Sequence, residues 1–228
     1  MNPHSDERIV DSWEKNATQW AATVRNRKVE SRKLVTDKAI VESILSHSPE
    51  SVMDVGCGEG WLIRELAPGV PHLVGVDVVP ELIELARTAG GGSFLAASYE
   101  EVAAGRIEGA FDVVVCNFSL LGKESVEALF GAVPGYLKSG GVFIVQTLHP
   151  VVANDQAYVD GWREGSWDGF GSEFVDPAPW YFRTLESWVA LFSDNGLRLA
   201  SMREPLHPDT GKPASVIFTG EVIPPSNF

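Results

Sequence analysis

The chain has 228 residues, of which 44% are hydrophobic and 21% are charged. This length and composition suit one large domain with a sizeable core. The formal net charge of -13 disfavours a surface that neutralises phosphates, so we expect no nucleic-acid partner. The sequence contains no long apolar run and no signal-like N-terminus, which predicts a cytoplasmic protein without a membrane partner. Nothing in the composition indicates an oligomeric state.

Two amphipathic helices are predicted ahead of the first strand. Apolar residues at helical spacing indicate one helix over residues 5–22, which carries Trp13 and Trp20. A second helix is expected from about residue 36 to residue 46. Residues 24–33 between them carry five basic side chains against one acidic side chain. This run is either a solvated connector or a segment that holds an anionic group.

The central motif of the chain is residues 51–60, SVMDVGCGEG. An apolar strand breaks into a loop with a glycine at every second position, and a helical pattern follows over residues 61–67. The glycines permit positive φ and let a ligand lie directly on the backbone. Asp54, two residues before the first glycine, would repel a diphosphate but suits a ligand that carries an ammonium or sulfonium group. The segment therefore predicts a nucleotide-binding unit other than the G-x-G-x-x-G of dinucleotide folds.

The D-x-G-x-G-x-G pattern that begins at Asp54 resembles motif I of the class I S-adenosylmethionine-dependent methyltransferases, and it matches that motif in full. The order of elements resembles the bacterial small-molecule enzymes of the type 11/12 kind. The resemblance implies S-adenosylmethionine as the cofactor, with Asp54 serving its methionyl ammonium group. It also implies that the N-terminal helices, residues 1–48, form a cap that folds over the cofactor; ordinary packing is the alternative. A glycine-rich structural turn is the alternative for the motif itself.

A second apolar strand, residues 72–77, ends in Asp77. Asp77 lies 19 residues beyond Gly58, close to the spacing of about 20 at which a carboxylate receives two ribose hydroxyls. The alternative is that Asp77 caps the helix that Pro80 opens. Together with the glycine motif, the spacing favours the ribose interpretation.

The adenine contacts depart from the family pattern. After a third short strand, residues 93–97, the family commonly has an acid near the adenine amine, whereas this chain has Ser98 followed by Tyr99. A serine can still accept one hydrogen bond, and the tyrosine ring can cover the base. The predicted cofactor-binding residues are Asp54, Gly56, Cys57, Gly58, Asp77, Val78, Ser98, Tyr99, Asn117 and Phe118.

A fourth strand, residues 110–118, is predicted to be buried on both faces. Asn117 and Phe118 lie at its carboxyl end, where ligands bind in an open parallel sheet. Asp112 lies at the opposite end, so we expect it to be structural. The strand lacks the N/D-P-P-Y signature of enzymes that methylate base or amide nitrogens.

The regular pattern lapses after a helix over residues 123–137, a turn at 138–141 and a fifth strand at 142–147. Residues 148–184 contain eight of the 22 aromatic residues (7 Trp, 4 Tyr and 11 Phe), and aromatic density argues against disorder. We predict that residues 148–183 form an acceptor pocket. Its expected substrate-binding residues are Tyr158, Trp162, Arg163, Trp180 and Tyr181. The acidic local charge indicates a neutral or cationic acceptor, unless an arginine there binds a substrate carboxylate.

His149 is the predicted catalytic base. It follows the fifth strand directly, and an unperturbed histidine pKa near 6.5 suits proton removal at neutral pH. The alternative is that His149 and Pro150 turn the chain, with the imidazole bound to a backbone carbonyl. Cys57 and Cys116 are expected to be buried, unbonded thiols close to the cofactor, and no metal site is predicted.

The chain ends with a helix after Thr184 and two strands, at residues 197–202 and 215–222. The predicted fold is a single Rossmann-like, doubly wound α/β domain over residues 1–228, with a seven-stranded sheet whose last strand is antiparallel. The predicted function is methyl transfer from S-adenosylmethionine to the oxygen, nitrogen or carbon of a small molecule. The alternatives are a non-catalytic sensor or regulatory protein that binds S-adenosylmethionine and, with weaker support, an NAD-dependent oxidoreductase.

Overall fold

The computed structural model describes residues 4–152 and 156–223. Residues 1–3 of the predicted cap and 153–155 of the predicted insertion lie outside this part. The strands are β1 (Ser51–Val55), β2 (His72–Asp77), β3 (Ser93–Ala96), β4 (Phe111–Asn117), β5 (Leu137–Thr147), β6 (Gly161–Arg163), β7 (Trp180–Phe182), β8 (Leu197–Arg203) and β9 (Val216–Val222). The helices are α1 (Asp6–Arg25), the π-helix η1 (Arg32–Thr36), α2 (Asp37–Leu45), α3 (Trp61–Leu66), α4 (Pro80–Ala89), α5 (Tyr99–Ala103), α6 (Glu124–Tyr136) and α7 (Leu185–Asp194).

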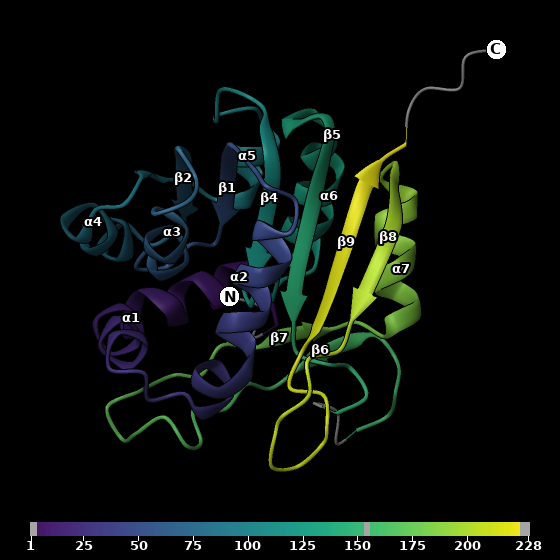
Figure 1. Ribbon diagram of the computed structural model, residues 1–228. Helices are drawn as coiled ribbons and strands as arrows, with labels where there is room; N and C mark the ends of the chain where they lie inside the picture. Colours follow the sequence, from purple (N-terminus) through teal and green to yellow (C-terminus); the bar gives the residue numbers. More distant parts are fainter. Residues whose placement is uncertain (1–3, 153–155, 224–228) are drawn as a thin grey trace.

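Seven strands form one sheet in the order β3-β2-β1-β4-β5-β9-β8 (Figure 1). Strand β9 is antiparallel to β5 and β8, and the other pairs are parallel. Strand β1 is buried along its whole length, as expected for a parallel strand covered on both faces. It pairs with β2 on one side and β4 on the other, which is the topological switch point where ligands bind. The predicted seven-stranded fold with an antiparallel last strand is confirmed.

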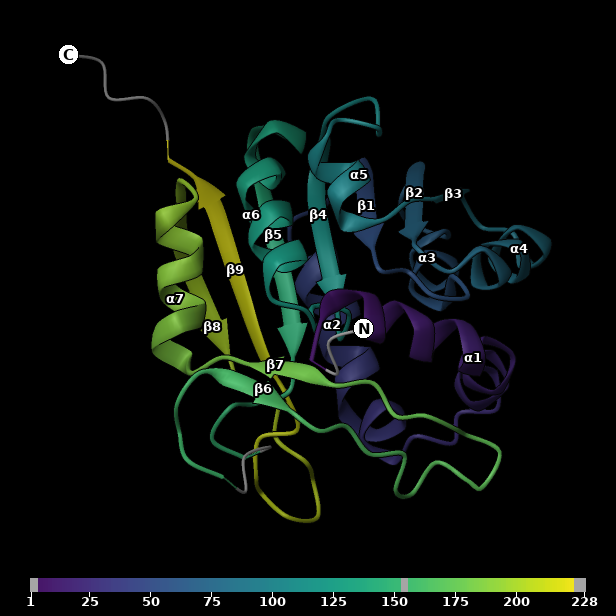
Figure 2. The same ribbon diagram turned by 180° about the vertical axis from the view of Figure 1, so that it is seen from behind.

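Helices cover both faces of the sheet, as Figures 1 and 2 show from opposite sides. Apolar residues of α2, α3 and α4 form a core with one face, and those of α5, α6 and α7 form a core with the other. Helix α1 and the ribbon of β6 and β7 lie at the end of the sheet to which the arrows of β4 and β5 point. Both segments are therefore placed over the carboxyl edge.

Three local predictions were wrong or incomplete. The predicted turn at residues 138–141 lies inside β5, because Leu137 already pairs with Phe111 and a register shift follows. Helix α5 was not predicted, since five residues are too few to show a helical period. The S-x-x-E pattern of its capping box was the available signal. The predicted irregular insertion contains the two-stranded ribbon of β6 and β7.

Asp112 is structural, as predicted. Its carboxylate accepts hydrogen bonds from the backbone N–H groups of Glu50 and Ser51. It also forms an ion pair with Lys138. These contacts join the starts of β1 and β4 at the edge opposite the ligand-binding edge. Within the described residues, no helix is both long enough and apolar enough to cross a membrane.

Candidate active site

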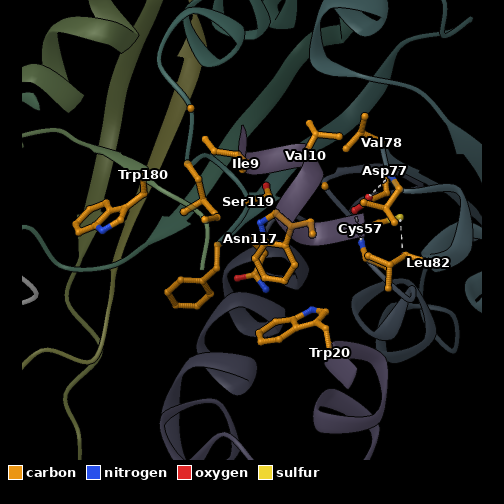
Figure 3. A pocket seen from close by; sticks show the side chains of 18 of the residues that line it. Ile9, Val10, Trp20, Cys57, Asp77, Val78, Leu82, Asn117, Ser119 and Trp180 are labelled. Carbon is orange, nitrogen blue, oxygen red and sulfur yellow. Dashed lines mark hydrogen bonds between the residues drawn. The ribbon is translucent and has the colours of Figure 1, made fainter. Parts of the chain in front are cut away.

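A cavity of about 930 Å³ lies at the carboxyl edge of the sheet (Figure 3). Its walls come from the glycine loop after β1, the ends of β2, β4 and β5, helix α1, and the insertion between β5 and α7. This volume lies near the upper end of the range for small-molecule sites, which is roughly 300–1,000 Å³. The cavity is therefore large enough to hold more than one small ligand.

The glycine loop is shaped by its neighbours. The backbone N–H groups of Gly56 and Cys57 both donate to the carbonyl of Val76, at 2.7 and 2.9 Å. Gly56 has a φ of 82°, and a Cβ there would overlap the side chain of Ser119. Only glycine combines this conformation with so close an approach of a neighbouring side chain. The first glycine of the motif therefore has a steric cause.

Asp77 lies at the end of β2 and lines the cavity. Its Oδ2 accepts the Gly58 N–H at 2.8 Å, and its Oδ1 accepts the Val79 N–H at 2.9 Å. Burial raises the pKa of this carboxyl, although the backbone hydrogen bonds oppose the shift. The hydrogen bond from the Val79 N–H is the one expected if Asp77 caps helix α4, the alternative interpretation of this residue. A carboxylate can accept about four hydrogen bonds, so two remain for a ligand.

Asp54 is buried directly behind the glycine loop, with 2% of its surface exposed. Its Oδ1 has no hydrogen-bond partner in the described part of the chain. Burial, followed by the charge of Asp77, raises the pKa of Asp54 to about 8, while Arg32 opposes the shift. An unpaired buried carboxylate is costly, so this position favours a neighbouring cation.

Arg32, on the π-helix η1, supplies a cation to the cavity wall. Its guanidinium lies over the ring of Trp61 at 4.6 Å, and its Nε donates to Asp37 at 2.9 Å. Its Nη2 is buried and has no partner among the described residues. Asn117, on the same wall, likewise has a buried Oδ1 without a partner. The site thus offers unsatisfied donor and acceptor atoms beside the glycine loop.

The structure brings the predicted cofactor residues together. Nine of the ten line the cavity, and Asp54 lies behind them. Ser98 also caps α5, since its hydroxyl accepts the Glu101 N–H. The Tyr99 hydroxyl donates to the Ser119 carbonyl at 2.8 Å, so its ring rather than its hydroxyl is presented to the cavity. The nine are Gly56, Cys57, Gly58, Asp77, Val78, Ser98, Tyr99, Asn117 and Phe118.

Four aromatic rings close one side of the cavity, and we call them the aromatic wall: Trp13, Trp20, Trp167 and Phe170. The Trp13 ring lies 5.1 Å from Trp20 and 5.5 Å from Trp167. The Phe170 ring lies 6.0 Å from Trp20 and 5.7 Å from Trp167. Helix α1 and the insertion each contribute two rings. Each pair has a local interpretation in the sequence, but nothing there indicates that the two pairs meet.

Polar contacts hold α1 to the insertion, and we call this set the clasp: Arg8, Lys15 and Asn16 with Val175 and Asp176. The Asn16 side chain binds both the N–H and the carbonyl of Val175, at 2.9 and 2.8 Å. Arg8 and Lys15 form ion pairs with Asp176 at 2.7 and 2.6 Å. These two cations lower the pKa of Asp176 to about 2. The clasp closes the cavity on the side of the aromatic wall.

Of the five predicted substrate residues, Trp180 alone lines the large cavity. Successive strand residues point to opposite faces, so Trp180 and Tyr181 of β7 cannot both face it. Tyr181 instead lies against Trp162 of β6, at 5.6 Å. The Tyr158 hydroxyl accepts the Leu185 N–H, and Arg163 donates to two carbonyls of its own loop. These four residues build the ribbon and its surroundings, and the structure does not place them on the cavity wall.

His149 is buried, with 5% of its surface exposed, and it is not among the residues that line the cavity. Its Nε2 lies 2.7 Å from Glu204 Oε1, and its Nδ1 accepts the Val151 N–H at 3.3 Å. Both ring nitrogens are therefore engaged in holding the turn after β5. The geometry matches the alternative interpretation, in which His149 and Pro150 turn the chain, except that the imidazole binds the Glu204 carboxylate and not a backbone carbonyl. His149 is not positioned to reach a ligand in the cavity.

Both cysteines are buried, and neither forms a disulfide in the structure. Cys57 lines the cavity, whereas Cys116 belongs to the core on the α6 face and is not on the wall. Burial raises the pKa of both thiols, which makes them poor nucleophiles. Among the described residues, no group of three or more His, Cys, Asp or Glu side chains could hold a metal ion.

The sheet order, the glycine loop at the switch point and the acid at the end of β2 define a nucleotide-cofactor-binding protein of the doubly wound α/β class. A family model described as "Methyltransferase domain" matches residues 25–202, more than half of the chain. The chain belongs to this methyltransferase domain family. Its fold is that of the class I S-adenosylmethionine-dependent methyltransferases.

The relatives of known name share only part of their length with this chain. A demethylmenaquinone methyltransferase from Deinococcus radiodurans is 37% identical over 86 residues, 36% of each chain. A ubiquinone biosynthesis O-methyltransferase from Xylella fastidiosa is 34% identical over 114 residues, 48% of this chain and 46% of that one. The structure of an amino pentose methyltransferase from Micromonospora echinaspora, with S-adenosylmethionine bound, has a TM-score of 0.64, 19% identity, and coverage of 88% and 95%. The chain thus spans less than half the length of these two curated relatives.

Proposed function

We propose that this protein transfers a methyl group from S-adenosylmethionine to a small-molecule acceptor. The observation that carries the proposal is the division of the cavity into two ends (Figure 3). Cys57, Asp77 and Val78 lie at one end, which we call the cofactor end. Trp180 lies at the other, the acceptor end, with Asn117 and Ser119 between them. A donor and an acceptor bound at these ends would meet at the carboxyl end of β4.

The residues at the cofactor end fit the chemistry of S-adenosylmethionine. Asp77, with two free acceptor positions, suits the ribose diol. The unpartnered Nη2 of Arg32 suits the methionyl carboxylate, and the unpartnered carboxylate of Asp54 suits the ammonium. Val78 and Tyr99 offer apolar surfaces for the adenine. In this proposal, Arg32 of the basic segment, residues 24–33, holds an anionic group of the cofactor. This is one of the two interpretations of that segment in the sequence.

The sulfonium supplies an activated methyl group, so the protein's main task is to hold the acceptor atom in line with the methyl group and the sulfur. The aromatic wall and the clasp enclose this space and shape it. Asn117 lies between the two ends with an unpartnered carbonyl oxygen, which can accept a hydrogen bond from a bound ligand. His149 has no part in this scheme, because it lies off the cavity wall.

Two features support a small acceptor rather than a macromolecule. The cavity is covered by α1 and the insertion, which the clasp joins. The net charge of -13 opposes binding to nucleic acid. The named relatives act on different acceptors, so their names do not identify the acceptor of this protein.

The test has two stages. Calorimetry with S-adenosylmethionine, S-adenosylhomocysteine and NAD should show binding of the first two and none of NAD. Release of S-adenosylhomocysteine is then measured against hydroxylated and aminated small molecules. Turnover with any of these acceptors supports the enzyme, whereas tight binding without turnover across the panel supports the sensor. Failure to bind S-adenosylmethionine would contradict both.

A further inference from the structure

The charges around the cavity are distributed unevenly. In the described part of the chain, Arg32 is the one Lys, Arg or His residue on the wall, and it is placed at the glycine loop. The acceptor end carries no such residue. A site built for a carboxylate or phosphate usually places an arginine or lysine against it, so an anionic acceptor is disfavoured. The acids that line the cavity are Asp6, Glu7, Asp11, Glu14, Glu59, Asp77 and Glu100.

Six of these seven acids are paired with cations, exposed, or part of the cofactor end. Glu59 pairs with Arg25 and Arg64, and Asp11 pairs with Arg8 and Lys15. Asp77 belongs to the cofactor end. Glu7, Glu14 and Glu100 are exposed at the rim. Asp6 is the remaining acid, and it lies at the acceptor end.

Asp6 is held rigidly at the start of α6. Its Oδ1 accepts the Lys123 N–H at 2.9 Å, and its Oδ2 accepts the Ser125 N–H at 2.7 Å. The N-terminus of a helix favours a negative charge at this position. Each oxygen keeps a lone pair for another donor. The wall therefore presents a fixed carboxylate that forms no ion pair within the described residues. The buried guanidinium of Arg183, which donates to the carbonyls of Gly122 and Lys123, interacts with its charge at longer range.

The strand that carries Trp180 is joined to the loop before α6, where Asp6 is bound. The next residue, Tyr181, donates its N–H to the Leu121 carbonyl at 2.7 Å, which ties β7 to the loop before α6. Trp180, Leu121 and Asp6 all line the cavity. Trp180 supplies an aromatic ring at this end of the cavity, and the faces of such rings attract cations. An apolar, ring-lined space with one fixed carboxylate suits an organic ammonium ion.

We propose that the acceptor is an amine with an apolar or aromatic body, and that Asp6 binds its nitrogen. This inference rests on the proposed function. The ammonium form binds to Asp6 and loses a proton to solvent before reaction. The nitrogen lone pair then forms the N–C bond to the methyl group, while the S–C bond breaks and its electrons stay on sulfur. The products are a methylated ammonium ion and neutral S-adenosylhomocysteine.

The test compares ligands that differ only in their end group. Calorimetry on protein saturated with S-adenosylhomocysteine measures 2-phenylethylamine, 2-phenylethanol and phenylacetate, and then tryptamine, tryptophol and indole-3-acetate. We expect each amine to bind more tightly than its alcohol, and each carboxylate to bind most weakly. The amines should also yield S-adenosylhomocysteine when incubated with S-adenosylmethionine. Carboxylates that bind as tightly as the amines, or amines that do not bind in either series, would overturn the proposal.

Two variants separate Asp6 from the general charge of the cavity. Asp6→Asn keeps an oxygen to cap α6 and should weaken amine binding about 10–100-fold, the scale for a hydrogen bond to a charged group. Alcohol and S-adenosylhomocysteine binding should be unchanged, which shows that the pocket is intact. Glu124→Gln removes the same charge from the start of the same helix α6, off the cavity wall, and should have little effect. Equal amine affinity in wild type and Asp6→Asn would overturn the role of Asp6.

The proposed function can fail independently of this inference. Protein that does not bind S-adenosylhomocysteine contradicts the methyltransferase site itself. Protein that binds it, and methylates an alcohol or a carboxylate in preference to the amines, contradicts the amine acceptor alone.

Discussion

The side chain of Asn16 binds both backbone groups of Val175, which lies 159 residues further along the chain. Asn16 is fully buried, and its Nδ2 also donates to the Ser12 carbonyl at 2.8 Å. The side-chain amide therefore pairs with the Val175 backbone through one donated and one accepted hydrogen bond, and this pair fixes the position of the insertion on α1. Trp13 and Trp167 lie 5.5 Å apart across the same junction. The shape of the cavity on the side of the aromatic wall thus depends on this one side chain.

We predict that Asn16→Ala opens the clasp. The substitution leaves the Val175 N–H and carbonyl without this partner, which should cost about 1–3 kcal/mol of stability. It should raise both the KM of the acceptor and the Kd of S-adenosylmethionine, because the clasp holds the aromatic wall, whose Trp20 lies beside Gly58 and Arg32. Chemical denaturation, steady-state kinetics and calorimetry measure these effects.

Asn26→Ala is the matched control for the clasp. Asn26 follows the same helix, and its side chain donates to the Ala22 carbonyl without reaching the insertion. The control should leave the acceptor KM unchanged. An equal rise in KM for both variants would show that general loosening of α1, and not the clasp, shapes the cavity.

Asp54 makes stability depend on pH. Its pKa is about 8 in the folded chain against an ordinary value of 3.8, and burial is the main cause. The folded state therefore binds a proton that the unfolded state releases between these two pH values. Its contribution to stability is fully present below pH 3.8 and is lost as pH rises toward 8. Compared with wild type, Asp54→Asn should lose less stability between pH 5 and pH 8, as measured by urea denaturation; parallel curves would contradict the shift.

Cofactor binding should be linked to the same proton. A cationic methionyl group favours the ionised form of Asp54, so binding at pH 7 should release a proton. Calorimetry in two buffers with different ionisation enthalpies measures this release. Titration of the ligand itself is common to both proteins, so the informative quantity is the difference between wild type and Asp54→Asn. Equal proton release in the two would place the ammonium elsewhere.

We predict that His149→Ala keeps its turnover. The imidazole contacts Glu204 and the Val151 N–H and lies off the cavity wall, so it is not positioned to take a proton from an acceptor. The variant should lose stability through the turn after β5, while kcat stays within about threefold of wild type. A loss of about 10²–10⁴-fold, the usual scale for a positioned base, would restore the catalytic hypothesis drawn from the sequence.

The sequence indicated which residues meet around the glycine loop because their signals are local. Gly56 and Asp77 are fixed by a strand, a tight loop and a spacing of about 20 residues, all of which are written along a short stretch of chain. The sheet order followed from the same repeated pattern. Arg32 could be suspected only as one of several basic residues, since the π-helix that directs it has no clear sequence signal.

The sequence could not indicate which residues of the insertion line the cavity, because this depends on contacts between distant segments. The aromatic density of the insertion indicated a pocket but could not say which rings face it. Trp180 and Tyr181 are adjacent in sequence, yet strand alternation sends them to different sides. His149 was chosen for its place after β5, whereas its orientation is set by Glu204, 55 residues away. The partnership of α1 with the insertion had no local signal.

We propose that the carboxyl edge of this sheet binds S-adenosylmethionine through Asp77, and calorimetry on two aspartate variants provides the sharpest test of this site. Asp77→Ala removes the carboxylate at the ligand-binding edge, and Asp112→Asn alters the one at the opposite edge. We predict that Asp77→Ala weakens binding by about 1.5–3 kcal/mol, or roughly 10–100-fold, while Asp112→Asn retains the wild-type Kd. An unchanged Kd in Asp77→Ala, or wild-type protein that does not bind S-adenosylmethionine, would contradict the account.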